Sequence, residues 1–168
     1  RQSARWELID EVQQAVEIPV IGNGDLLTPW DLEKRREETS IRSFLVARGA
    51  LIKPWIFREL ETGEPWDPTV AERWEIMQSF VGFAKEHFGD DEKGMQRVER
   101  FVLWHWKWWH RYRPWTAGDH AETWPESLVQ ARNRRVEGDP ELELLASEDE
   151  EDHRGILRRL LDCDFPTE

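Results

Sequence analysis

The stretch Ile18–Phe57, IPVIGNGDLLTPWDLEKRREETSIRSFLVARGALIKPWIF, predicts two strand–turn–helix units in succession. The β-branched run Ile18–Ile21 ends at the turn Gly22–Asp25, a pattern typical of a buried parallel strand followed by a tight loop. A helix is predicted over Pro29–Glu38, because Thr28 is a good N-cap and proline is favoured at the first helical position. The first half of the stretch therefore predicts one complete βα unit.

The second half of the stretch repeats this pattern. A strand is predicted over Phe44–Val46, and Ala47–Ala50 supplies a second glycine-containing turn. Glycine lets main-chain N–H groups converge on an anion, and a helix N-terminus adds a partial positive charge. In an eight-stranded α/β barrel the last two βα loops commonly bind phosphate. The two turns together predict a phosphate site, although either one alone is also compatible with an ordinary strand-ending turn.

The two turn sequences together resemble those of a known enzyme family. Asn-Gly-Asp at 23–25, followed by Ala-Arg-Gly-Ala-Leu-Ile-Lys-Pro-Trp at 47–55, resembles the C-terminal barrel strands of tRNA-dihydrouridine synthases, most of all their eukaryotic-type branch. In that family these two turns hold the phosphate of FMN. The resemblance therefore implies that the cofactor-binding residues are Asn23, Gly24, Asp25, Ala47, Arg48 and Gly49.

The resemblance also implies a reaction and a fold. Dihydrouridine synthases reduce uridine in tRNA to 5,6-dihydrouridine with FMN that is itself reduced by NADPH, and a cysteine acid protonates the uracil. They bind FMN in a TIM (β/α)8 barrel and hold tRNA with a C-terminal helical domain. The family's catalytic cysteine lies on earlier barrel strands, so no residue of this chain is assigned a catalytic role. We expect α/β followed by all-α structure: a C-terminal barrel fragment joined to a helical bundle, inactive by itself.

Length and composition agree with that expectation. The chain has 168 residues, whereas a complete barrel needs ~250. It carries a net charge of −12, one cysteine, and no apolar run near the ~20 residues needed to span a bilayer. A single cysteine excludes an internal disulfide and fits a reducing cytosol. We therefore expect a cytoplasmic monomer that binds neither a membrane nor a metal.

The chain is predicted to divide at a linker containing Gly and Pro, residues 61–66 (ETGEPW). Residues 1–60 form the predicted α/β part, and residues 67–168 form the predicted all-α part. Two long helices are predicted, one from Asp67 to His87 that is ended by Gly89 as a C-cap, and one from Glu92 to about Tyr112. Shorter helices are predicted at Trp124–Arg135, Pro140–Ala146 and Asp149–Leu161.

The predicted helix from Glu92 carries a stripe of cations around one tryptophan. Its members recur at spacings of 4, 3, 4, 3 and 4 residues, which places them on one narrow helix face, and they are Lys93, Arg97, Arg100, Trp104, Lys107 and Arg111. The opposite face is predicted to face the helical core, and it carries Met95, Val98, Val102, Trp106 and Trp109. Residues 91–136 hold 9 basic and 6 acidic side chains, whereas the segments before and after are net acidic. Cations beside an aromatic can bind a phosphate backbone and stack a base. The stripe predicts RNA binding, and the resemblance implies tRNA.

Other interpretations of these patterns remain open. The stripe could be a solvated face whose Lys and Arg stems cover apolar neighbours. The chain could belong to a small-molecule FMN-dependent barrel oxidoreductase, because fold does not fix function, or it could be a non-catalytic RNA-binding helical module. A second contact patch is predicted at Arg132, Arg134 and Arg135. None of the histidines has a convincing catalytic partner, and the acidic surroundings of Cys163 make it a poor nucleophile.

Overall fold

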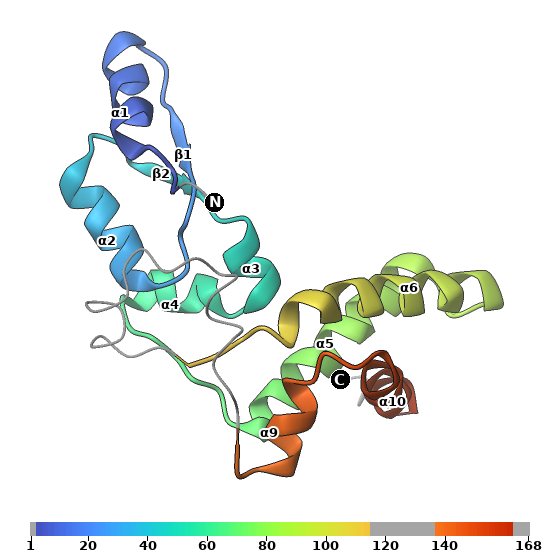
Figure 1. Cartoon of the computed structure of the whole chain (residues 1–168). Helices are drawn as coiled ribbons and strands as arrows, with labels where there is room; N and C mark the ends of the chain where they lie inside the picture. The colour runs from blue at the N-terminus through green and yellow to red at the C-terminus, as the bar shows by residue number, and fades with distance from the viewer. Residues whose placement is uncertain (1–2, 115–136, 163–168) are drawn as a thin grey trace. The chain divides into compact units, whose positions relative to one another are not determined.

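The computed structural model describes residues 3–114 and 137–162 as a largely helical chain with one small parallel sheet (Figure 1). The chain divides into two compact units, and the boundary falls between Trp66 and Asp67. Tyr112 is part of the first unit, although the sequence places it in the helical part. The described residues are 3–66 and 112–114 in the first unit, and 67–111 and 137–162 in the second.

The first unit alternates helices with two short strands. Its elements in order are α1 (Trp6–Ala15), β1 (Ile21–Asn23), α2 (Pro29–Glu38), β2 (Ser43–Leu45), α3 (Arg48–Ile52) and α4 (Ile56–Thr62). The strands pair in parallel, with Gly22 opposite Phe44 and Asn23 opposite Leu45. Parallel strands end at the same edge of a sheet, so the loop after β1 and the loop after β2 are neighbours.

The strand β1 begins at Ile21 and continues through Gly22 to Asn23, so the prediction of a strand over Ile18–Ile21 was wrong in its bounds. Pro19 has no N–H to donate to a ladder. The N–H of Val20 donates instead to Oε1 of Gln13 at 2.7 Å. Strand pairing can therefore begin only after these two residues, which moves the strand into the glycine turn.

The second βα connection is shorter than predicted. β2 ends at Leu45, one residue before the predicted end. The predicted turn Ala47–Ala50 is a turn only in part, because α3 already begins at Arg48 and Ala47 is its N-cap residue. The N–H of Ala50 donates to the carbonyl of Ala47 at 3.1 Å, which closes the first helical turn.

The predicted helix Pro29–Glu38 is confirmed as α2, with Thr28 as its N-cap. The hydroxyl of Thr28 accepts the N–H of Asp31 at 3.2 Å, and Oδ2 of Asp31 accepts the N–H of Thr28 at 2.8 Å. This reciprocal capping box satisfies N–H groups that a helix start otherwise leaves unpaired. The end of β1 is thereby joined to α2 in a defined geometry.

The core of the first unit forms around Trp6, Leu26 and Ile41, which are 3%, 3% and 0% exposed. A Cβ at Gly22 would lie 2.4 Å from the Trp6 ring, so only glycine lets β1 pass this close to the indole. Asp10 on α1 accepts both the N–H and the hydroxyl of Ser40, at 2.7 and 2.6 Å. These hydrogen bonds hold the pKa of Asp10 below its usual value and tie α1 to the segment before β2.

The regular secondary structure among the described residues of the second unit is all helical. Its elements are α5 (Val70–Phe88), α6 (Glu92–Trp109), α9 (Pro140–Leu145) and α10 (Glu150–Asp162), and α10 packs against both α5 and α6. The buried side chains of α6, α9 and α10 include Val98, Val102, Trp106, Leu145, Ile156 and Leu160.

The long helices are both shorter than predicted. α5 begins after Thr69 and not at Asp67, because the Thr69 hydroxyl accepts the N–H of Glu72 and the Glu72 carboxylate accepts the N–H of Thr69. Its predicted end at Gly89 is confirmed. α6 ends at Trp109 and not near Tyr112, which belongs to the first unit.

The described residues contain neither a helix that could span a membrane nor a cluster that could bind a metal. Within 3–114 and 137–162, no helix combines the length and the apolar character needed to cross a membrane. Over the same ranges, no group of three or more His, Cys, Asp or Glu side chains could hold a metal ion. The predicted helix Trp124–Arg135, the patch at Arg132, Arg134 and Arg135, and Cys163 lie outside the described residues.

Candidate functional site

A hollow lies where the loops after β1 and β2 come together. The residues that line it are Asn23, Gly24, Asp25, Leu26, Leu27, Leu45, Ala47, Arg48 and Gly49. All six residues that were predicted to bind the cofactor therefore line one hollow. The three leucines were not predicted to bind a ligand, because apolar residues at the end of a strand are common whether or not a ligand is bound.

The loop after β1 adopts a backbone conformation that few residues tolerate. Gly24 has φ of 135° and Asp25 has φ of 51°, both in the left-handed region. Glycine enters this region readily, and aspartate is among the residues that tolerate it better than most. A Cβ at Gly24 would also lie 2.3 Å from the Cβ of Ala4. The loop thus requires glycine at position 24 for two separate reasons.

Gly49 brings the second loop against the first. A Cβ at this position would lie 2.5 Å from the carbonyl oxygen of Leu26 and 2.9 Å from Cδ1 of Ile56. The start of α3 can therefore approach the main chain of the first loop only because position 49 has no side chain. Arg48 and Gly49 are the first two residues of α3 and both line the hollow, and the first N–H groups of a helix have no acceptor within the helix.

Polar side chains join the two loops. Nδ2 of Asn23 donates to the carbonyl oxygen of Leu45 at 3.1 Å, which ties the ends of the two strands together. Nη2 of Arg48 lies 3.3 Å from Oδ1 of Asp25, and Oδ2 of the same carboxylate accepts the N–H of Ala4 at 2.7 Å. Arg48 is thus a cation at the hollow whose charge is opposed by one carboxylate.

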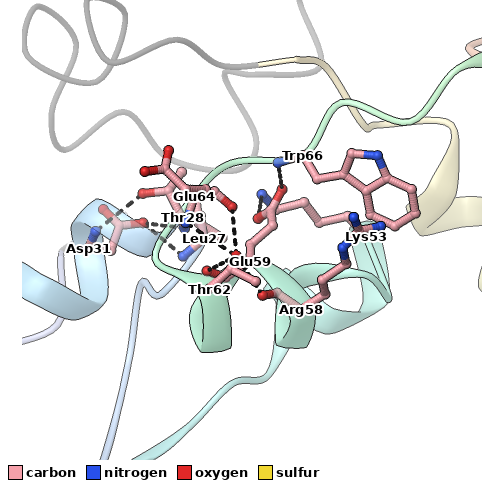
Figure 2. A network of polar contacts seen from close by, with 9 residues as sticks. All are labelled: Leu27, Thr28, Asp31, Lys53, Arg58, Glu59, Thr62, Glu64 and Trp66. Atoms are coloured by element: carbon pink, nitrogen blue, oxygen red, sulfur yellow. Dashed lines mark hydrogen bonds and ion pairs between the residues drawn. The ribbon is translucent and has the colours of Figure 1, made fainter.

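The start of α2 is capped by a carboxylate. Oδ2 of Asp31 accepts the N–H groups of both Leu27 and Thr28 at 2.8 Å, and Asp31 is 1% exposed (Figure 2). This buried carboxylate already neutralises much of the partial positive charge at the helix N-terminus. The α2 N-terminus therefore has little positive charge left to offer an anion.

A buried ion pair supports α3 and α4 beneath the hollow. Nζ of Lys53 contacts Oε2 of Glu59, and the two residues are 9% and 1% exposed. The other carboxylate oxygen of Glu59 accepts the N–H of Trp66 at 3.0 Å, and the guanidinium of Arg58 lies 4.0 Å from the centre of the Trp66 ring (Figure 2). Because Lys53 follows α3 directly, this pair fixes where the helix ends.

The cationic stripe predicted on α6 is exposed. Lys93, Arg97, Arg100 and Lys107 are all exposed, and within the described part of the chain none of the four forms an ion pair. Arg111 lies beyond the end of the helix and places its guanidinium 4.7 Å from the centre of the Trp108 ring. The opposite face of α6 is buried, as predicted, through Val98, Val102, Trp106 and Trp109.

The histidines of the second unit lie among aromatic rings. Nδ1 of His105 is 3.1 Å from the carbonyl oxygen of Phe101, and its ring is 4.6 Å from that of Phe80. Burial lowers the pKa of His105, although the contact with the Phe101 carbonyl opposes this shift. His110 and His153 have ring centres 5.6 Å apart. Neither arrangement presents a nucleophile beside a base.

Comparison with known proteins gives the following matches. Residues 1–134 match the family model described as Dihydrouridine synthase (Dus). A human protein named as tRNA-dihydrouridine(47) synthase-like, with NAD(P)+ in its name, is 40% identical over 101 residues, which cover 60% of this chain and 15% of that protein. A Kluyveromyces lactis protein named as tRNA-dihydrouridine(47) synthase is 34% identical over 169 residues, covering 90% of this chain and 25% of that protein. The chain thus spans a quarter or less of these relatives.

Proposed function

This chain belongs to the dihydrouridine synthase family, and from that membership we propose that it takes part in the flavin-dependent reduction of uridine to 5,6-dihydrouridine in tRNA. The observation that carries the proposal is the convergence of both glycine-containing loops on one hollow. The relatives that carry NAD(P)+ in their names support NADPH as the reductant of the flavin. We assign neither the reductant site nor the proton donor to a residue of this chain.

We propose that β1, α2, β2 and α3 are two consecutive βα units of a TIM barrel. Three features support this assignment: the strands are parallel, a helix connects them, and both loops emerge at the same sheet edge. In barrel enzymes the site lies at the carboxyl ends of the strands, where these loops are. The helical second unit then corresponds to the tRNA-holding part of the protein.

The hollow fits the phosphate group of FMN. Main-chain N–H groups of Arg48 and Gly49 at the start of α3, together with the Arg48 guanidinium, are the donors that would hold it. Gly49 permits this approach, since a Cβ there would collide with the Leu26 carbonyl oxygen. Asn23, Gly24 and Ala47 shape the two loops. Asp25 carries a negative charge and would repel a phosphate. We therefore propose that Asp25 maintains the shape of the loop and competes with the phosphate for Arg48.

FMN, when bound, supplies the hydride that reduces the uracil ring. We assign no residue of this chain to that step. We propose that its residues hold one end of the cofactor and contact the substrate RNA. We propose that the RNA contact is the face of α6 formed by Lys93, Arg97, Arg100, Trp104 and Lys107, together with Arg111 just beyond the helix end. Exposed cations attract a phosphate backbone, and Lys93, Arg97, Arg100 and Lys107 form no ion pair within the described residues.

Each of the two rival functions leaves one feature of the structure unexplained. A small-molecule flavin enzyme has no use for an exposed face of unneutralised cations, such as α6 presents. A non-catalytic RNA-binding module has no use for two loops built around Gly24 and Gly49. Because the same chain has both features, an enzyme that acts on RNA accounts for more of the structure than either rival.

The cofactor part of the proposal is tested by NMR on the isotopically labelled chain. Inorganic phosphate, FMN and riboflavin are titrated separately, since riboflavin has the same ring system as FMN but lacks the phosphate. We expect phosphate and FMN to shift the amide signals of Gly24, Arg48 and Gly49, and riboflavin to leave them unchanged. Arg48→Ala should abolish the shifts, whereas Arg36→Ala on the exposed side of α2 should not. Shifts elsewhere, or equal shifts with riboflavin, would reject the phosphate site.

A further inference from the structure

One aromatic ring on the cationic face of α6 is exposed to solvent. Trp104 is 48% exposed, whereas Trp106 and Trp109, on the buried side of the same helix, are 1% and 2% exposed. A single exposed ring is common on protein surfaces, so the exposure of Trp104 is informative only together with the exposed cations on the same helix face. Lys107 and Arg100 are exposed neighbours at spacings of 3 and 4 residues along the helix.

The neighbouring rings of Trp104 are already engaged. The Arg111 guanidinium lies 4.7 Å from the centre of the Trp108 ring. Phe101 stacks on Phe80, with ring centres 5.4 Å apart and planes 10° from parallel. In the described part of the chain, Trp104 meets other rings only at steep angles, at 80° with His105 and 59° with Trp108. Trp104 therefore has no stacked partner among the described residues, and no guanidinium lies over its ring there.

The edge of the Trp104 ring is held in place by a packed neighbour. Its ring centre is 4.8 Å from that of His105, in an edge contact. His105 in turn contacts the rings of Phe80 and Phe101, at 4.6 and 4.5 Å. Because these rings fix one another, Trp104 loses little conformational freedom when a ligand binds, which favours affinity.

We propose that Trp104 stacks an unpaired RNA base while the cations beside it bind the flanking phosphates, so that this face prefers single-stranded segments to duplex. A base inside a duplex already stacks on both faces, whereas an unpaired base presents a free face to an aromatic side chain. The preference rests on the proposed RNA-binding function and adds the kind of RNA segment that α6 contacts. Phosphate contacts alone do not favour a single strand, because a duplex carries the higher density of charge.

The experiment uses the full 168-residue chain and two RNA probes. One is a single-stranded oligoribonucleotide containing 2-aminopurine, whose fluorescence falls when the base stacks. The other is the same strand annealed to its complement. Affinities are measured by anisotropy at two salt concentrations for the wild type, Trp104→Ala, Trp104→Leu and Phe83→Ala. Phe83 is 69% exposed on α5 and has no neighbouring cationic stripe, so it is the matched control.

The wild type should bind the single strand more tightly than the duplex and quench 2-aminopurine. Trp104→Ala should weaken single-strand binding by roughly fivefold or more, as expected for loss of one base–aromatic stack. It should also abolish the quenching and leave duplex binding unchanged. Trp104→Leu should behave like Trp104→Ala, because leucine keeps apolar surface but has no aromatic face. Phe83→Ala should match the wild type, and circular dichroism should show intact helices in each variant.

The results that would reject base stacking by Trp104 differ from the result that would reject RNA binding. RNA binding that keeps its strength and its quenching in both Trp104 variants would overturn the stacking inference and leave the RNA-binding proposal intact. Equal losses for single strand and duplex would also overturn the inference, since they would show a general weakening of the face. No RNA binding by the folded wild type at low salt would overturn the RNA-binding proposal itself. If the face bound an acidic protein and no RNA, the RNA-binding proposal would be overturned in the same way.

Discussion

Asp25 and Arg48 meet across the two loops of the first unit, with Oδ1 of Asp25 3.3 Å from Nη2 of Arg48. Their side chains are 29% and 39% exposed. Ion pairs with this much solvent contact contribute about 0–1 kcal/mol to stability. The pair therefore matters more for the charge of the hollow than for the stability of the fold.

Replacing Asp25 with asparagine should strengthen the binding of a phosphate-bearing ligand. The change removes the negative charge that opposes Arg48, and asparagine tolerates the left-handed φ of this position. We expect inorganic phosphate to bind severalfold more tightly to Asp25→Asn than to the wild type, measured by NMR titration. Arg48→Ala should weaken binding. If both variants weaken it equally, the pair acts as one unit and the competition between Asp25 and phosphate is rejected.

Gly49→Ala should destabilise the first unit. The added Cβ would lie 2.5 Å from the main-chain oxygen of Leu26, so the two loops must separate. We expect a loss of roughly 1–3 kcal/mol, the usual range for overpacking. Gly155→Ala in α10 is the control with the opposite sign, because a Cβ there meets nothing within 4 Å and alanine favours a helix by about 0.5–1 kcal/mol. Urea unfolding followed by circular dichroism measures both, and a neutral Gly49→Ala would refute the close approach.

Glu59→Gln should destabilise the first unit strongly. The substitution leaves Lys53 buried without its carboxylate, and breaking a buried pair in this way generally costs about 3–5 kcal/mol. Glu33→Gln is the matched control, because Glu33 pairs with Arg36 on the surface at 4.0 Å, where the side chains are 66% and 51% exposed. Its effect should stay below about 1 kcal/mol. Similar unfolding midpoints for the two variants would show that the Lys53–Glu59 pair is not a support of α3.

His105 should make the second unit less stable in mild acid. Burial lowers its pKa in the folded state, so below the ordinary histidine pKa of ~6.5 the unfolded chain binds more protons. The contribution of neutral His105 to the free energy of unfolding is therefore complete above this pH. It is lost as the pH falls toward the pKa of His105 in the folded state. His105→Phe keeps the aromatic contacts and should make the decline in stability below about pH 6.5 shallower. Urea unfolding across this range is the measurement, and an unchanged profile would contradict the assignment.

Charge reversal of Arg97 and Arg100 should weaken tRNA binding and reduce its salt dependence. Each lost phosphate contact lowers the slope of log affinity against log salt by roughly 0.7–0.9. Filter binding over a salt series measures both quantities. The control is reversal of Arg36, an exposed cation of the first unit on α2. Identical slopes for the wild type and the Arg97/Arg100 variant would exclude this face from the RNA interface.

Local signals in the sequence predicted some of the structure well. Thr28 followed by Pro29 predicted the start of α2, since capping is decided by residues within one helical turn. Gly89 predicted the end of α5 for the same reason. The spacing along α6 predicted which side of that helix is buried, because helical periodicity depends only on the order of residues.

Other features depend on contacts between distant residues. Val20 was predicted in a strand, but its N–H donates to Gln13 on the preceding helix. The requirement for glycine at position 49 arises from the Leu26 carbonyl, which no pattern around Gly49 reveals. Lys53 and Glu59 are six residues apart, a spacing that predicts no helical ion pair, and they meet because α3 ends and α4 begins between them.

Trp55 and Tyr112 belong to the same unit, with ring centres 4.8 Å apart at an angle of 81°, yet α5 and α6 lie between them in the chain. During synthesis, Trp55 leaves the ribosome before its aromatic partner has been made. Domains emerge from the N-terminus at roughly 5–20 residues per second, so this indole waits for several seconds in a half-formed unit. During this interval the Trp55 ring has its contact with Trp66 but lacks its contact with Tyr112, and a stop codon placed before Tyr112 would remove that second contact for good.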